Sequence, residues 1–160
     1  MGPILLILMA VCMGAFVLYT LHTSKRYRAE AIRAFAIRSG MHYIGDAIPK
    51  SLTLQGTPFY HASKVWNVID GEPRGTRIMA FDCRVGVGKQ SWRRTIIAVE
   101  GDGDAFGVMP DMTIDRSGRW AILYRPKDSI FSFRLAGLTP VEELGANLNA
   151  VIIGSAKTSP

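Results

Sequence analysis

The N-terminal segment carries an unbroken apolar pattern that differs from everything after it. No charged residue lies between Gly2 and Leu21, and Leu, Ile, Val, Met and Phe fill most of these positions. Twenty residues in an α-helix rise about 30 Å, which matches the hydrocarbon core of a bilayer. The pattern therefore predicts a transmembrane anchor over residues 1–23.

A cleaved signal peptide and a buried core helix also contain long apolar runs. A signal peptide needs basic residues before the run and small residues before the cut. Nothing basic precedes Pro3, and the run ends in Tyr19-Thr20-Leu21-His22. An uncleaved anchor is therefore the favoured interpretation.

The next segment, residues 24–40, changes to a helical pattern with many charges. Alanines favour the helix, and Gly40 supplies a stop signal. Ile32, Phe35 and Ala36 share one face, whereas the basic residues surround the cylinder. We expect a basic juxtamembrane helix that continues the anchor, either straight or with an elbow.

From Met41 onward, frequent Gly and Pro residues divide the chain into short pieces with period-two patterns, which favours strands. Strands are predicted at residues 64–70, 77–85, 91–99, 119–124 and 130–135. Thr139-Pro140-Val141-Glu142 has the pattern of a capping box, which predicts a helix ending near Ala150 and a flexible tail over residues 154–160. The predicted fold class is α+β: an N-terminal transmembrane helix, then a mostly antiparallel sheet domain of about five strands over residues 41–153 with a C-terminal helix.

Charge is concentrated beside the apolar run. The formal charge of the chain is +6; residues 24–39 hold five basic residues and one acid, and the chain from Gly40 onward has a net charge of only +2. Cations that flank a span stay on the cytoplasmic side. We therefore expect Lys25, Arg26 and Arg28 to contact the membrane surface, with the soluble domain in the cytoplasm. Nucleic acid is a less favoured partner, because the bilayer is the nearest polyanion.

Two loops resemble ligand sites incompletely. Gly86-Val87-Gly88-Lys89 is similar to a phosphate-binding loop, but Cys83 replaces its first Gly and Gln90 its Ser or Thr. The stretch from Glu100 to Asp104, with Asp111 beyond it, has the acid spacing of a calcium loop, but Ala105 replaces the Gly of the sharp turn. We interpret the first as a hairpin turn and the second as a solvated turn, and expect no metal and no cofactor.

His61, Asp82 and Cys83 are the candidates for a pocket. Folding that brought them together would pair a nucleophile with a base. However, alternation places Cys83 on one face with Met79, Phe81 and Val85, which favours an inert core thiol. Cys12 lies in the apolar run, so the two cysteines form no disulfide framework.

A second candidate surface combines aromatic and basic residues. Trp92-Arg93-Arg94 and Trp66 have the composition of a surface that stacks on bases and contacts phosphates. Exposed faces and edges of sheets carry the same residue types. The low net charge after Gly40 favours this second interpretation.

Several segments together resemble a group of uncharacterised bacterial proteins with one N-terminal span and a small soluble domain. They are Ser39-Gly40-Met41-His42-Tyr43, residues 49–58, Val65 to Gly71, residues 78–83 with the Phe81-Asp82 pair, and residues 92–99 with their Thr-Ile-Ile-Ala-Val run. The resemblance covers roughly residues 1–100. It implies the plasma membrane of a bacterium and no particular activity.

The favoured function is a membrane-anchored, noncatalytic interaction or structural module whose partners are the lipid bilayer and a second membrane protein. Two alternatives stay open. One is a membrane-tethered enzyme or small-ligand binder with a pocket near His61, Asp82 and Cys83. The other is binding of anionic lipid or nucleic acid through the basic flank.

Overall fold

The structure is a computed structural model that describes residues 2–88, 91–101, 112–126 and 138–156. The chain divides into two compact units, residues 1–31 and residues 32–160. We refer to them as unit 1 and unit 2, and each is described by itself.

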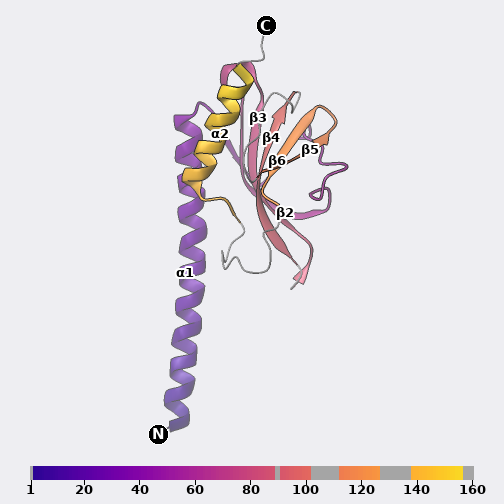
Figure 1. The fold of residues 1–160 in the computed structure, drawn as a ribbon. Coiled ribbons are helices and arrows are strands. Elements are labelled where there is room, and N and C mark those ends of the chain that lie inside the picture. Colours follow the sequence, from indigo (N-terminus) through magenta and orange to yellow (C-terminus); the bar gives the residue numbers. More distant parts are fainter. Residues whose placement is uncertain (1, 89–90, 102–111, 127–137, 157–160) are drawn as a thin grey trace. The chain divides into compact units, whose positions relative to one another are not determined.

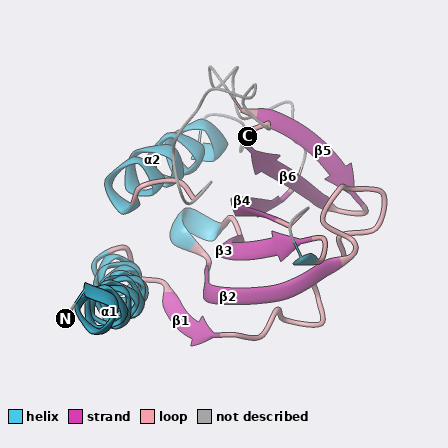
Figure 2. Cartoon of the chain, turned by 90° about the horizontal axis from the view of Figure 1, so that it is seen from below, coloured by secondary structure: helices cyan, strands magenta, loops and turns pink. Residues whose placement is uncertain are grey.

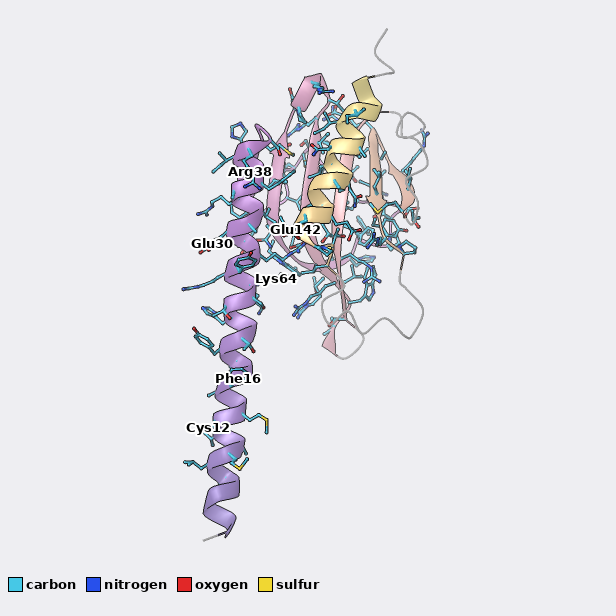
Figure 3. All side chains as sticks on the ribbon, turned by 60° about the vertical axis from the view of Figure 1, so that its left-hand side comes forward. Cys12, Phe16, Glu30, Arg38, Lys64 and Glu142 are labelled. Carbon is cyan, nitrogen blue, oxygen red and sulfur yellow. The ribbon has the colours of Figure 1, made fainter. Side chains whose placement is uncertain are left out.

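Unit 1 is the larger part of one continuous helix, α1 (Gly2–Arg38) (Figure 1). Its apolar side chains lie exposed, including Leu8, Phe16 and Leu18, which are 61%, 68% and 69% exposed. Figure 3 shows Cys12 and Phe16 projecting from this apolar half of α1, and Glu30 and Arg38 from its polar half. Within the described residues, one helix, Ile7–Arg38, is long and apolar enough to cross a membrane. A signal sequence near the N-terminus can have the same length and apolar composition.

The end of α1 follows from Gly40, as the sequence predicts. Gly40 has a φ of +68°, a left-handed conformation that glycine adopts at little cost. The Met41 N–H donates to Ala36 O at 2.8 Å and the Gly40 N–H to Ile37 O at 3.3 Å, the two bonds of a Schellman cap. The predicted juxtamembrane helix is thus the last part of α1, with no separate start.

Unit 2 is built on a six-stranded antiparallel sheet with the strand order β1-β2-β3-β4-β6-β5. Its strands are β1 (His42–Gly45), β2 (Ala62–Gly71), β3 (Ile78–Val85), β4 (Trp92–Glu100), β5 (Thr113–Ser117) and β6 (Trp120–Tyr124), with a short 3-10 turn, η1 (Pro73–Gly75), between β2 and β3. Helix α2 (Val141–Ala156) lies along one face of the sheet (Figure 2).

Both faces of the sheet are buried, which explains why β3 is apolar along most of its length instead of alternating. On the first face, Ile32, Phe35 and Ala36 from the end of α1 and Leu144 and Leu148 from α2 join one core cluster with the strands. We call it the helix-covered face.

The opposite face is covered by the long connection between β1 and β2, and we call it the loop-covered face. Leu52 and Phe59 of this connection pack with Phe81, Cys83 and Trp120 of the strands. The Trp120 indole N–H donates to Ser51 O at 3.0 Å, and the Ser117 hydroxyl donates to Gln55 O at 2.7 Å. These bonds hold the connection against the sheet and satisfy backbone carbonyls that a buried loop would otherwise leave unpaired.

The predicted α+β class and antiparallel sheet are confirmed, but two strands were not predicted. β1 and β5 are the edge strands of the sheet, and the predicted strand at residues 130–135 lies outside the described residues. The predicted end of the last helix near Ala150 is wrong, because α2 continues to Ala156. The reason is packing: Val151 and Ile152 extend the buried stripe begun by Leu144 and Leu148.

Candidate functional site

Asp82 is the centre of a buried polar cluster on the helix-covered face. Its side chain is 0% exposed in the middle of β3. The Asn67 Nδ2 donates to Asp82 Oδ2 at 2.9 Å, and the Thr95 hydroxyl donates to Asp82 Oδ1 at 2.8 Å. Both carboxylate oxygens thus have a side-chain donor, which a buried carboxylate requires.

Asn67 reaches Asp82 because β2 is irregular at this point. The register between β2 and β3 shifts between Trp66 and Ile69, so β2 carries an extra residue there. Asn67 has a φ of +55°, which side chains other than glycine, Asn and Asp rarely adopt. The bulge turns the Asn67 amide toward Asp82 and is held by the bond that results.

The cluster extends to β1 and to the start of α2. The Tyr43 hydroxyl donates to Asn67 Oδ1 at 3.2 Å, and the Thr139 N–H donates to Thr95 Oγ1 at 3.0 Å. Burial raises the pKa of the Tyr43 hydroxyl; the carboxylates of Asp46 and Asp82 act in the same direction, and Arg33 opposes them. The Arg33 guanidinium lies 4.9 Å from the centre of the Tyr43 ring. We call Tyr43, Asn67, Asp82, Thr95 and Thr139 the Asp82 cluster.

The geometry gives the Asp82 cluster a positioning role. Its hydrogen bonds connect β1, β2, β3, β4 and the residue that leads into α2, so they fix the relative position of these elements. Among the described residues, no group of three or more His, Cys, Asp or Glu side chains is arranged to hold a metal ion. The Asp82 oxygens accept bonds from an amide and a hydroxyl, both of which belong to neighbouring strands of the sheet.

Cys83 lies on the loop-covered face, next to Asp82 in sequence but on the other side of β3. It packs with Met79 and Phe81, which confirms the alternation predicted for this strand. Burial, together with the negative charge of Asp82, raises the pKa of the Cys83 thiol to about 12. A thiol with that pKa is almost entirely protonated at neutral pH and a poor nucleophile.

His61 does not join either residue. It is exposed just before β2, where its ring packs edge-on against Tyr60 with 4.7 Å between ring centres. The register places Val65, four residues further along, opposite Cys83. The structure thus separates His61, Asp82 and Cys83 into a surface position and two opposite faces of the sheet.

The predicted aromatic and basic surface is also divided between faces. Trp92 packs against Phe59 on the loop-covered face, with Arg94 5.2 Å from its ring centre. Trp66 stands opposite Asp82 and so belongs to the helix-covered face. The two tryptophans therefore do not form one stacking surface.

The remaining predicted sites lie in unit 1 or in turns. Lys25 and Arg26 are exposed on α1, and Arg28 is half-buried. Gly86 and Gly88 have positive φ values of 83° and 62° in the turn between β3 and β4, and a strand follows, as expected of a hairpin and not of a phosphate-binding loop. Lys89, Gln90 and the acidic residues of the predicted turn at 102–111 lie outside the described residues.

Sequence reasoning missed Asn67, Thr95 and Tyr43 as partners of Asp82. A usable signal was present: Asp82 and Thr95 are polar residues inside strands that are otherwise apolar. Two such residues on neighbouring strands often form a pair. The position of Asn67 depends on the bulge, and no sequence pattern in β2 predicts that bulge.

Comparison of the chain with family models, with curated proteins and with solved structures finds no match.

Proposed function

We propose that the chain is a noncatalytic interaction or structural module, anchored by α1 as a single-pass protein in a bacterial plasma membrane, with unit 2 on the cytoplasmic side. The observation that carries the proposal is the exposed apolar surface of α1. Ile7, Val11 and Leu18 are each more than 60% exposed. A helix that is apolar on all sides needs lipid or a protein core around it, and lipid suits a helix of this length.

The continuity of α1 favours an anchor over a cleaved signal peptide. Cleavage after the apolar run would fall inside a helix that continues for more than a dozen residues to Arg38. The end of that same helix supplies Ile32, Phe35 and Ala36 to the core of unit 2. Keeping the helix whole thus serves the folded unit as well as the membrane.

The side-chain geometry favours a noncatalytic role. The Asp82 carboxylate already accepts bonds from Asn67 and Thr95, and Cys83 is buried on the opposite face with a raised pKa. The alternative pocket near His61, Asp82 and Cys83 receives no support from this arrangement. For a tethered module, confinement to the bilayer raises the effective concentration for any membrane-bound partner.

The anchor and its orientation are tested in intact cells with a reporter fused after Pro160. We expect a cytoplasmic signal and retention of the chain in membranes washed at alkaline pH. Reversing the charge of Lys25, Arg26 and Arg28 to Glu is expected to move a fraction of the reporter to the other side, since cations beside a span set its orientation. The matched control reverses Lys50, Arg74 and Arg119, which lie beyond the flank, and should leave the orientation unchanged. A reporter signal outside the cytoplasm for the wild-type chain would contradict the proposed orientation.

The interaction role is tested at the two edges of the sheet, because edge strands present unpaired backbone groups to a partner. Ile44 in β1 and Ile114 in β5 are exposed at these edges, 43% and 37%. A photoreactive residue at either position should capture a discrete membrane protein in native membranes, whereas one at the exposed loop position Thr53 should not. Recovery of only uncrosslinked chain at both edges would argue against a protein partner.

A further inference from the structure

The cations of unit 2 are distributed unevenly along its sheet. Near the turn that joins β2 to β3, Arg77 is paired with Asp70 at 2.9 Å, and Arg119 is paired with Glu100 at 3.0 Å where β4 ends. At the opposite end, near the turn that joins β3 to β4, lie Lys64, Arg84 and Arg93. Within the part of the chain that the structure describes, none of these three forms a salt bridge with a carboxylate.

The three unpaired cations form a row across three adjacent strands. Lys64 stands opposite Arg84, and Arg84 stands opposite Arg93. Directly opposed side chains share a face of the sheet and lie about 5 Å apart at their Cβ atoms, so like charges in this arrangement destabilise the fold. An anion that binds beside these three cations would reduce their repulsion and stabilise the folded chain. We call Lys64, Arg84 and Arg93 the basic row.

The surroundings of the basic row hold one of its cations in place and carry an apolar side chain beyond it. Ser63 is the extra residue of a second irregularity in β2, between Ala62 and Lys64; its Oγ accepts from Arg84 Nε at 3.4 Å, and its hydroxyl donates to the Arg84 and Gly86 carbonyls at 3.2 Å. The turn beyond the row ends in Val87, which is 82% exposed between two glycines. Surfaces that bind a bilayer commonly combine basic residues with an exposed apolar side chain. The basic residues contact the headgroups, and the apolar side chain reaches the boundary with the acyl chains.

The first residues of unit 2 are connected to the Asp82 cluster, which forms the row next to the basic row. The first residues of unit 2 are Ile32 and Arg33, and Arg33 stacks on Tyr43, which bonds to Asn67 of the Asp82 cluster. Asp82 precedes Arg84 by two residues on β3, about 7 Å along the strand. The proposed anchor would keep unit 2 near a bilayer, which raises the effective concentration of lipid headgroups for a basic surface of unit 2.

We infer that the basic row of Lys64, Arg84 and Arg93 docks unit 2 onto the anionic phospholipid surface of the membrane that holds the chain, with Val87 at the headgroup level. The inference rests on the proposed anchoring and adds a second membrane contact, distinct from Lys25, Arg26 and Arg28. Each cation near an anionic leaflet contributes about fivefold to the ratio of docked to undocked molecules, so the row contributes about a hundredfold.

The experiment uses the full chain in lipid nanodiscs with a fluorescent label at position 87. The labelled protein carries Cys12→Ser and Val87→Cys; Cys83 is buried and stays unlabelled at neutral pH. Quenching of the label by acrylamide, which is uncharged, is measured in discs of phosphatidylcholine alone and in discs with about a third phosphatidylserine. We expect quenching to fall at least twofold in the anionic discs at low salt, and to return in 0.5 M NaCl, because salt screens exposed charges.

Substitutions separate the row from general charge. Lys64→Gln, Arg84→Gln and Arg93→Gln together should abolish the protection, each single change weakening docking about fivefold. The matched control, Lys50→Gln with Arg74→Gln and Arg119→Gln, removes the same charge from positions outside the row and should keep it. Should the triple variant of the row be poorly folded, the charge-conserving pair Arg84→Lys and Arg93→Lys provides the second test and should retain protection.

The outcomes are distinguishable from those of the anchoring proposal. Failure of the chain to elute with the discs would overturn anchoring, and the inference with it. A chain that elutes with the discs but is quenched equally in both lipids would overturn the inference alone. The inference would also be overturned if the control variant lost as much protection of the label from quenching as the variant of the basic row. It would be overturned equally if inorganic phosphate or duplex DNA protected the label in neutral discs as well as the anionic lipid does, because the ligand would then not be the lipid surface.

Discussion

Replacing Asp82 by Ala is expected to lower the free energy of unfolding of unit 2 by about 3 kcal/mol. The change leaves two buried donors, the Asn67 amide and the Thr95 hydroxyl, without their acceptor. Each orphaned buried donor costs about 1 to 3 kcal/mol, so the pair sets a range of about 2 to 6 kcal/mol. The lower half of the range applies because removing the carboxylate also removes the cost of burying its charge.

Two further variants identify the cause. Asp82→Asn retains one acceptor oxygen and should cost about half as much as Asp82→Ala. Thr95→Ser keeps the hydroxyl and should be within about 0.5 kcal/mol of wild type, whereas Thr95→Val removes it and should cost about 1 to 2 kcal/mol. Combining Asp82→Ala with Thr95→Val should cost less than the sum of the two, since they share one bond.

The assay is equilibrium unfolding in urea of the full chain in detergent, followed by tryptophan emission. All three tryptophans of the chain, Trp66, Trp92 and Trp120, lie in strands of unit 2, so the signal reports the sheet and not α1. A loss below about 0.5 kcal/mol for Asp82→Ala, or equal losses for Thr95→Ser and Thr95→Val, would refute the argument that the cluster holds the strands together.

Other positions give sharper single effects. Asn67→Gly should be more stable than Asn67→Ala by about 1 kcal/mol in the same urea assay, because both lose the same amide but only Ala resists a φ of +55°. Gly40→Ala should lower the free energy of unfolding by about 1 kcal/mol. The cause would be the left-handed backbone at the helix cap and not a steric clash, because a Cβ at this position would meet nothing within 4 Å. An unchanged midpoint of the urea transition would contradict this. The pKa of the Cys83 thiol is about 12 when folded, so the unfolded chain loses this proton first and stability falls as pH rises from about 9 toward 12. Between pH 9 and pH 10 the fall should be about 1 kcal/mol larger in wild type than in Cys83→Ala, in which only the raised pKa values of Tyr43 and Tyr124 remain.

The sequence predicts the long strands well because their apolar residues are set by burial. The segments of β2, β3, β4 and β6 are rich in Ile, Val, Trp and Phe, and all four were predicted to within two residues of their bounds. β1 and β5 carry the sequences HYIG and TIDRS, too short and too polar to form a pattern of their own. Each is a strand because it pairs with one neighbour at the edge, and that pairing is a tertiary property.

The candidate site was predicted less well for an identifiable reason. Asp82 was singled out, but it was grouped with Cys83 because the two are adjacent in sequence. Adjacent residues of a regular strand point to opposite faces, so the rule that placed Cys83 in the core also separates it from Asp82. The true partner Asn67 could not be found in this way, because the bulge changes which face each residue of β2 occupies.

On the helix-covered face of unit 2, three successive rows of residues across the strands differ in polarity. One row across the sheet is wholly apolar and buried: Ile69, Ala80, Ile97 and Leu123. The next contains Asp82 and Thr95, which are buried but hydrogen-bonded, and the third is the basic row. A buried carboxylate tolerates no loss of its donors, whereas removing one of several like charges at the surface relieves a small repulsion. Substitutions in the Asp82 cluster should therefore lower stability without altering lipid docking in molecules that remain folded. Neutral substitutions in the basic row should weaken docking and leave stability equal to wild type or slightly higher. If one set of variants changed both the free energy of unfolding and lipid docking in parallel, the Asp82 cluster and the basic row would act as a single unit.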